Sequence, residues 1–133
     1  MNQQIIPRGV TWDVAVTRVT SIIPNMFEKN NKDSLVVFYD GAECMRKLEE
    51  HNIANKRPRG YSCEELGGVI LSDDLFMKSH LRLSNLEPVF VSPFGSGSLR
   101  YVNLFIENDQ IHATWQQSMK DFSQPLLYNR ISI

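Results

Sequence analysis

Cysteine is scarce in this sequence, and neither sign of charge is in excess. The two cysteines, Cys44 and Cys63, are too far apart for a redox pair and too few for a structural zinc site, so we expect free, buried thiols. The net charge is −1, and acidic and basic residues are spread along the whole chain. The sequence therefore lacks the strongly basic surface that is typical of nucleic-acid-binding proteins.

Long hydrophobic runs are missing as well. No apolar run approaches the roughly 18 residues of a membrane-spanning helix, and the opening residues, MNQQIIPRGV, lack the features of a secretory signal. We therefore expect no membrane association and a cytoplasmic location. Of the 133 residues 42% are hydrophobic, which is enough for a core without disulfides or metal ions. The absence of repeats and linkers predicts a single globular domain over residues 1–133.

The first half of the chain is expected to contain both helices and strands. The apolar run SLVVFYD (34–40) predicts a buried strand, because its residues are β-branched or aromatic. Asp40 and Glu43 have the spacing of a capping box, which predicts a helix directly after that strand. In residues 12–24 the hydrophobic positions fit helical spacing better than strict alternation, and residues 75–83 follow an acidic pair typical of a helix start. We therefore predict helices in both segments, and a strand in GVILS (68–72) between them.

From Pro88 onwards the pattern is that of a β-meander over about residues 88–117, followed by an edge strand after Pro125. If the segments RYVNLFIE and QIHATWQQ pair across Asn108-Asp109, all their apolar side chains lie on one face. We therefore expect an α+β fold, with an antiparallel sheet of about five strands and two to four helices packed on one side. The expected apolar pairs are Ile106 with Ile111, Leu104 with Ala113 and Val102 with Trp115.

The segment SPFGSGSLR (92–100) has the small residues of a phosphate-binding loop but not the rest of the motif. A dinucleotide-binding loop needs a third glycine and a following helix, and a P-loop ends in Gly-Lys-Ser or Gly-Lys-Thr. Here the next element alternates like a strand, and Gly95 and Gly97 can supply positive φ angles in a tight connection. We interpret the segment as a bend between two strands and expect no cofactor.

The second face of the expected hairpin carries the candidate binding site. Tyr101, Asn103 and Phe105 alternate on it, and His112 falls opposite Phe105. Phe94, in the glycine-containing bend, completes this protein-interface set. Aromatic side chains in a polar setting are typical anchors of protein interfaces. Since no convincing catalytic set appears, we predict a small non-enzymatic binding protein whose partner is another protein, for example an inhibitor, an immunity-type partner or an adaptor module.

A nucleic-acid-binding domain is the first alternative. The only basic cluster is Lys56, Arg57 and Arg59, in NKRPRGYS, and Arg100 directly precedes the aromatic strand. Aromatic residues two apart on a strand can stack on bases, as in sheet-type RNA readers. This alternative requires the four cations to converge on one exposed surface with the two aromatic rings of the hairpin face.

A small hydrolase centred on His112 is the second alternative. IHATW matches an apolar-His-apolar-Thr-apolar pattern of phosphodiester-cleaving enzymes, in which two histidines act as base and acid. A second copy of the pattern is missing, because Arg82 stands where the hydroxyl should follow His80. Thr114 and Cys63 are the other groups that such an enzyme would use. The acidic pairs of the chain more simply begin helices or face solvent, so we expect no metal site.

Overall fold

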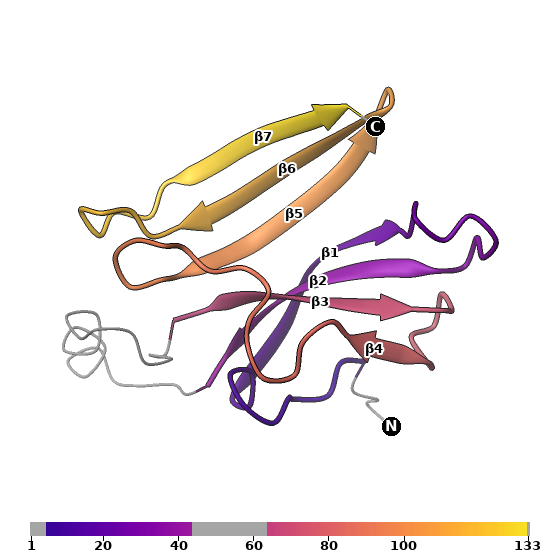
Figure 1. Ribbon diagram of the computed structural model, residues 1–133, viewed down its shortest axis with the longest axis horizontal. Helices are drawn as coiled ribbons and strands as arrows, with labels where there is room; N and C mark the ends of the chain where they lie inside the picture. The colour runs from indigo at the N-terminus through magenta and orange to yellow at the C-terminus, as the bar shows by residue number, and fades with distance from the viewer. Residues whose placement is uncertain (1–4, 44–63, 133) are drawn as a thin grey trace.

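The computed structural model of the chain describes residues 5–43 and 64–132, which form an all-β structure. Seven strands build two antiparallel sheets, and the described residues contain no helix, so the expected α+β class is wrong. Figure 1 shows the strands and their order along the chain. Sheet A has the order β1 (Val16–Pro24), β2 (Leu35–Ala42), β3 (Leu66–Ser72) and β4 (His80–Arg82), and sheet B has the order β5 (Leu99–Glu107), β6 (Gln110–Gln117) and β7 (Leu126–Ser132).

The two sheets meet along β5. In Figure 1 sheet B lies obliquely across sheet A, and β5 is the strand of sheet B nearest to it. β5 lies close to β1, β2 and β3, and among the described strands it makes all the close backbone approaches between the two sheets. Sheet B is therefore anchored along one edge, and its other two strands extend away from sheet A.

The predicted helix over residues 12–24 is wrong, because residues 16–24 form β1, which pairs antiparallel with β2. A β-bulge between Val19 and Ser21 explains the misleading pattern. Across the bulge, Val19 and Ile22 lie on the same face although they are three residues apart. That spacing resembles one turn of a helix, but the β-branched residues of this segment are suited to a strand.

Asp40 does not begin a helix, contrary to the predicted capping box. β2 continues through it to Ala42, and the Asp40 side chain is fully buried within the sheet. The remainder of that predicted helix falls in residues 44–63, which lie outside the described residues together with Cys44 and Cys63.

Residues 75–83, the third predicted helix, form a turn and then the short strand β4. Asp74 stabilises the turn, because its carboxylate accepts hydrogen bonds from the backbone N–H groups of Phe76, Lys78 and Ser79. These bonds, that of Ser79 foremost, lower the pKa of Asp74. The acidic pair before this segment therefore caps a turn rather than a helix. No described residue belongs to a helix that could cross a membrane.

Sheet A separates two hydrophobic clusters. The first lies between one face of the sheet and the segment that precedes β1, and it contains the stacked rings of Trp12 and Tyr39, whose centroids are 5.6 Å apart. The second lies between the two sheets, where Phe38 and Val69 of sheet A pack against residues of β5 that include Val102. Sheet A thus has both faces covered over much of its area, whereas only β5 of sheet B takes part in a cluster.

Two adjacent glycines let aromatic rings approach both faces of β3. A Cβ atom on Gly67 would lie 2.9 Å from Cβ of Phe90, and one on Gly68 would lie 2.4 Å from the ring of Tyr39. Any larger residue would collide with these rings, so the glycines serve close packing inside a strand. The predicted strand at 68–72 is confirmed and begins two residues earlier, at Leu66.

The predicted register of the β5–β6 hairpin is confirmed, apart from one bulge. Between Arg100 and Asn103 the register shifts, so Tyr101 and Val102 together stand across from Trp115. The bulge changes the direction of Tyr101 and leaves the pairing beyond it intact. The confirmed pairs are Asn103 with Thr114, Leu104 with Ala113, Phe105 with His112 and Ile106 with Ile111.

The meander is longer at its end and shorter at its start than predicted. The segment PVFVS (88–92) contributes only an isolated bridge between Phe90 and Gly67, so it is not a strand of the meander. The predicted edge strand after Pro125 is confirmed as β7, which pairs with β6. The meander therefore runs over residues 99–132.

The glycine-containing segment before β5 is a bend, as predicted. Gly95 and Gly97 have φ angles of 54° and 82°, in the region that favours glycine. The Gly97 N–H donates a hydrogen bond of 2.9 Å to the carbonyl oxygen of Phe94, and the chain then enters a strand rather than a helix. A Cβ atom on Gly95 would lie 2.2 Å from Oγ of Ser118, which further restricts this position to glycine.

Candidate functional site

The candidate site lies on the outer face of sheet B, the face turned away from sheet A. Alternation along β5 puts Val102 and Leu104, which pack against sheet A, on the opposite face. Strand pairing sets the outer side chains in two neighbouring rows across β5, β6 and β7. These rows, which define the outer face, are Asn103–Thr114–Tyr128 and Phe105–His112–Arg130.

Three rings form a cluster on the outer face. The rings of Phe105 and His112 are stacked, with centroids 4.6 Å apart and planes inclined by 6°. The ring of Tyr128 lies 6.0 Å from that of His112, and a hydrogen bond of 2.8 Å joins its hydroxyl to His112 Nδ1. Phe105 is 46% exposed and Tyr128 is 56% exposed. Stacking and the hydrogen bond fix the His112 ring, so this ring cluster presents a rigid and partly apolar surface.

Tyr101 belongs to a different cluster, because the β5 bulge turns it towards the junction of the sheets. Its φ angle is 56°, and its ring lies between two guanidinium groups. The Arg18 group is 4.7 Å from the ring centroid and the Arg100 group is 5.1 Å from it, both within the range of a cation–π interaction. Of the predicted interface residues, Phe105 and His112 are therefore in contact, Asn103 lies in the next row, and Tyr101 is engaged elsewhere.

Phe94 contributes to a third surface, at the end of sheet B where β6 leads into β7. Lys120 lies over its ring, with Nζ 5.3 Å from the centroid. Together with residues of the β6–β7 connection it lines an open depression of about 530 Å³. The other lining residues are Met119, Lys120, Asp121, Ser123 and Pro125.

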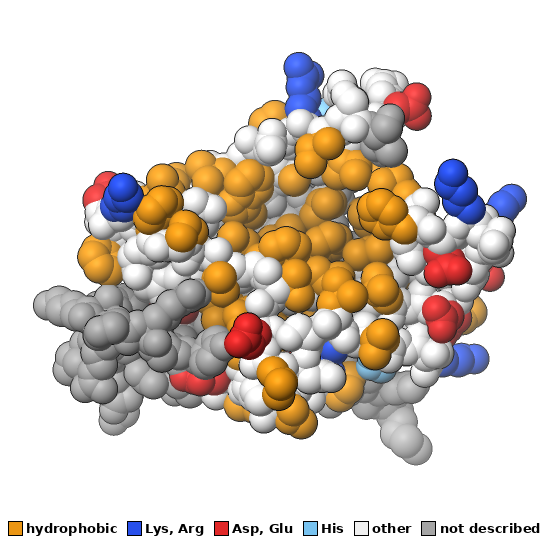
Figure 2. Space-filling view, viewed as in Figure 1, with side chains coloured by type: hydrophobic (Ala, Val, Ile, Leu, Met, Phe, Trp, Pro, Cys, Tyr) orange, Lys and Arg blue, Asp and Glu red, His pale blue; other side chains and the backbone are white. Residues whose placement is uncertain are grey.

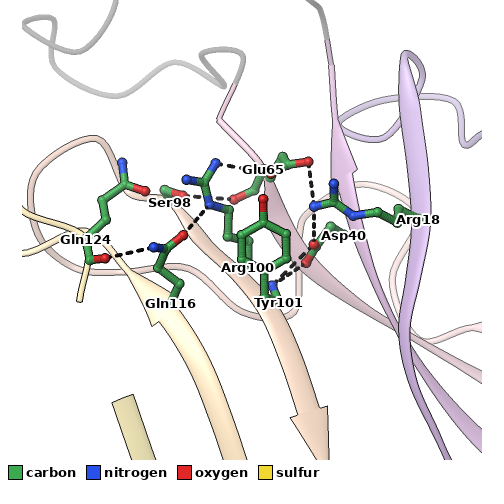
Figure 3. Close-up of polar contacts among 8 residues, drawn as sticks. All are labelled: Arg18, Asp40, Glu65, Ser98, Arg100, Tyr101, Gln116 and Gln124. Atoms are coloured by element: carbon green, nitrogen blue, oxygen red, sulfur yellow. Dashed lines mark hydrogen bonds and ion pairs between the residues drawn. The ribbon is translucent and has the colours of Figure 1, made fainter. Parts of the chain in front are cut away.

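An ionic network joins the two sheets beside Tyr101 (Figure 3). Asp40 of β2 accepts a hydrogen bond of 2.8 Å from Nη2 of Arg18 and one of 3.0 Å from the backbone N–H of Tyr101. Glu65 bridges two guanidinium groups: its Oε1 is 2.7 Å from Arg18 and its Oε2 is 3.1 Å from Arg100. The network therefore connects two strands of sheet A to the bulge of β5.

Burial and pairing act in opposite directions on the charges of this network. Burial raises the pKa of Asp40 above its ordinary value, and the hydrogen bonds from Arg18 and from the Tyr101 amide offset that effect only in part. Burial by itself lowers the pKa of Arg18, but the hydrogen bond to Asp40 and the charge of Glu65 outweigh it, so the pKa of Arg18 rises. A permanently charged guanidinium therefore stands beside a carboxyl group that takes up a proton more readily than it does in water.

Arg100 is occupied by contacts within the protein. Besides its ion pair in the network, it donates a hydrogen bond of 2.9 Å from Nε to Oε1 of Gln116 on β6. Lys56, Arg57 and Arg59, the other cations of the nucleic-acid alternative, lie outside the described residues. The one described cation of that set is thus held at the junction of the sheets and gives the alternative no support.

His112 has aromatic neighbours rather than an acid–base partner set. The contacts of its ring are with Phe105 and Tyr128, on an open sheet face, and Thr114 lies next to it in the neighbouring row. Cys63 lies outside the described residues. Among residues 5–43 and 64–132, no three His, Cys, Asp or Glu side chains form a group that could hold a metal ion. The surroundings of His112 therefore offer no support for the hydrolase alternative.

Tyr128, the third member of the ring cluster, was not among the predicted interface residues. β7 continues the meander, and Tyr128 pairs with Thr114 on the outer face. Extending the predicted β5–β6 register to the last segment would have found it, because alternation from Leu127 leaves Tyr128 on the face of Thr114.

Known proteins provide no further guide to this surface. Comparison of the chain with protein-family models, with curated proteins and with solved structures finds no match. The exposed rings of the outer face and the ionic network beside them are therefore the observations that bear on function.

Proposed function

We propose that this chain is a small non-enzymatic binding protein that acts through protein–protein contact, and that the outer face of sheet B is its contact surface. The ring cluster of Phe105, His112 and Tyr128 carries this proposal. Rings of this kind bury a large area and lose little conformational freedom on binding, because stacking and a hydrogen bond already hold them. A cytoplasmic location, which two widely spaced cysteines favour, is part of the proposal.

The composition of the outer face indicates the chemistry of the partner. Asn103 and Thr114 stand beside the rings, and the exposed Arg130 completes the row of His112. Mixed aromatic and polar surfaces are typical of interfaces that form and dissociate, whereas permanent interfaces are more apolar. A matching partner offers an apolar pocket to the rings and a carboxylate to Arg130.

A quantitative pull-down with the purified chain as bait tests this function. The wild-type chain is expected to retain one protein stoichiometrically. The double variant Phe105→Ala/Tyr128→Ala is expected to bind that protein at least about 30-fold more weakly, since truncating two aromatic anchors costs about 2 kcal/mol or more. The control Lys32→Ala changes an exposed residue of the β1–β2 connection and is expected to bind as the wild type does.

Two results would contradict the proposal. Equal retention of the partner by the double variant would show that the outer face is not the contact surface. Loss of all retained protein after nuclease treatment would favour the nucleic-acid alternative, with a steep fall of affinity with salt as its second sign.

A further inference from the structure

β7 is the edge strand of sheet B on the side away from sheet A, as Figure 1 shows. Six of its seven residues are exposed, and its pairing with β6 runs from Leu126 to Ser132 without a register shift. Figure 2 shows hydrophobic side chains gathered where the two sheets meet, with most charged side chains around them. The outer edge of β7 therefore lies beyond this junction and presents a regular, accessible backbone.

The register of the hairpin shows which backbone groups of β7 point outward. Glu107 and Gln110 close the two-residue turn as a hydrogen-bonded pair, and such pairs then alternate along β5 and β6. The backbone of Ile111, Ala113 and Trp115 consequently points towards β7 and bonds to their partners there. The N–H and C=O groups of the residues between those partners point outward. These outward residues are Leu126, Tyr128, Arg130 and Ser132.

The hydrogen bonds at the two edges of sheet B agree with this assignment. The N–H of Arg130 donates a bond of 2.9 Å to Oδ1 of Asn129, its neighbour in the chain, rather than to β6. On the opposite edge the same alternation turns the backbone of Leu104 outward, and there the hydroxyl of Ser21 binds it. Within residues 5–43 and 64–132, no hydrogen bond from another element reaches the outward backbone groups of β7.

The other three edge strands of the described sheets are each protected. β4 has only three residues, and β1 carries a bulge. β5 also carries a bulge, and side chains of sheet A bind its backbone. Short strands, bulges and charged side chains are the features that keep sheet edges from pairing with other chains. Of these features β7 has a single charge, that of Arg130, so it is the edge at which an added strand fits.

Arg130 indicates the chemistry of such a strand. Its side chain is exposed, and no acidic side chain among the described residues pairs with it. Leu126 and Tyr128, which are 70% and 56% exposed, lie on the same outer face. A strand that pairs antiparallel with β7 places every second side chain beside one of these three. From its N-terminus, the matching order is therefore an acidic residue and then two apolar or aromatic residues at alternate positions.

A second copy of this chain does not match the edge. β7 contains no Asp or Glu, so antiparallel pairing of two β7 strands would bring two Arg130 side chains to one face without an acid between them. An acidic extended segment of a different protein supplies the missing charge.

We propose that the partner protein adds such a segment to sheet B as a fourth strand, antiparallel to β7. Its backbone bonds with Leu126, Tyr128 and Arg130 supply affinity, and its alternate side chains supply specificity. A carbonyl group of the added strand then replaces Oδ1 of Asn129 at the N–H of Arg130. This inference rests on the function proposed for the outer face, because the added strand extends the rows of that face by one residue each.

Fluorescence anisotropy with a labelled synthetic peptide and the full chain tests the added strand. The probe has about seven residues, with glutamate, tyrosine and valine at alternate positions and threonine elsewhere. It is expected to bind with a Kd of about 100 μM or tighter. The same peptide with lysine in place of glutamate meets Arg130 with a like charge and is expected to bind about 10-fold more weakly.

Methylation of the peptide backbone distinguishes strand pairing from contact through side chains alone. Methyl groups on the amide nitrogens of the glutamate, tyrosine and valine remove the donors that face β7, and binding is expected to weaken by about 30-fold or more. The matched control carries three methyl groups on the intervening amide nitrogens, which face away from β7. It has the same side chains and is expected to bind within about 3-fold of the unmodified peptide.

Arg130→Glu tests the position of the peptide on the chain. This variant is expected to prefer the lysine peptide over the glutamate peptide, which reverses the preference of the wild type. Lys32→Glu makes a similar charge change at an exposed residue of the β1–β2 connection and is expected to keep the wild-type preference. Circular dichroism that matches the wild type confirms that both variants are folded.

Three results would overturn the added strand. The first is no binding of the glutamate peptide at about 1 mM chain, and the second is equal affinity of the two methylated peptides. The third is a wild-type dimer in sedimentation equilibrium that the peptide dissociates, which would assign the edge to a second copy. The pull-down with Phe105→Ala/Tyr128→Ala decides the function of the outer face separately. A partner lost by that variant, together with equal binding of both methylated peptides, would remove the added strand and keep the outer face as the contact surface.

Discussion

At the scale of single residues, Asp40 is a buried carboxylate that binds both sheets at once. It accepts hydrogen bonds from Arg18 in sheet A and from the backbone of Tyr101 in sheet B, and its side chain is 0% exposed. An asparagine of the same shape replaces one acceptor oxygen by an NH₂ group, so Arg18 or the Tyr101 amide loses its acceptor. We expect Asp40→Asn to lower the free energy of unfolding by about 1–2 kcal/mol, because one buried donor is left unpaired while Arg18 keeps Glu65.

Urea unfolding followed by circular dichroism measures this loss. The control Asp73→Asn removes an exposed carboxylate of the same type and is expected to change the free energy of unfolding by less than about 0.5 kcal/mol. A loss of similar size in both variants would show that Asp40 does not hold the junction of the sheets.

The pH dependence of stability tests the raised pKa of Asp40 separately. A raised native pKa means that the folded chain binds the proton more tightly than the unfolded chain does. The contribution of Asp40 is therefore complete below its unfolded pKa of about 3.9 and is lost as the pH rises through the native pKa. We expect the stability difference between wild type and Asp40→Asn to be larger at about pH 4 than at about pH 7. A difference that shrinks on acidification would mean that pairing with Arg18 outweighs burial.

At the scale of elements, the β5–β6 hairpin has a two-residue turn whose second residue, Asp109, is not the one that this turn type prefers. Asn108 and Asp109 both have positive φ angles, 50° and 59°, as in a type I′ turn. Glycine is the preferred second residue of that turn, since a Cβ atom is strained there. We expect Asp109→Gly to stabilise the protein by about 0.5–1 kcal/mol, which raises Tm by about 2–4 °C.

Thermal unfolding by calorimetry measures the change. Asn108→Ala is the opposite test, because alanine tolerates positive φ less well than asparagine, and it is expected to destabilise the protein by about 1 kcal/mol. A lower Tm for Asp109→Gly would mean that the Asp109 side chain makes stabilising interactions, and that their loss outweighs the relief of backbone strain.

This hairpin is also the element that the sequence predicts best. Its apolar residues alternate without interruption from Val102 to Ile106 and from Ile111 to Trp115, so a single register satisfies all of them. In β1 the bulge brings Val19 and Ile22 to one face at helical spacing, and a local pattern cannot distinguish that from a helix turn.

The ionic network could not be predicted, because its partners are distant in sequence. Asp40 and Glu43 have the spacing of a helix cap, and only the positions of Arg18 and Tyr101, 22 and 61 residues from Asp40, show that the carboxylate lies inside a sheet. The ring cluster was predicted in part. The contact between Phe105 and His112 follows from the hairpin register. The bulge that turns Tyr101 away from the same face could not be predicted, because the sequence still alternates through it.

At the scale of the whole molecule, side chains of sheet A cap the free edge of sheet B. β5 is an edge strand, and the carboxylate of Asp40 and the hydroxyl of Ser21 bind its backbone where a further strand would otherwise pair. Ser21 donates to the carbonyl oxygen of Leu104 and accepts from its N–H, both at 3.0 Å. Such capping protects the edge from pairing with other chains and fixes the angle between the sheets.

The hydroxyl of Ser21 should therefore control the stability of sheet B more than that of sheet A. Ser21→Ala leaves the N–H and C=O of Leu104 without these partners, and we expect amide exchange in residues 99–132 to become about 5- to 30-fold faster, with little change in β2 and β3. Hydrogen-exchange mass spectrometry measures both regions in one experiment. Ser72→Ala is the matched control, because Ser72 is a buried serine of sheet A. Its hydroxyl binds the backbone of the following turn, namely the carbonyl groups of Asp74 and Ser79 and the N–H of Asp74, so faster exchange is expected in that turn alone. If amide exchange in Ser21→Ala became faster by the same factor in both sheets, the two sheets would open together. The Ser21 hydroxyl would then not stabilise sheet B separately from sheet A.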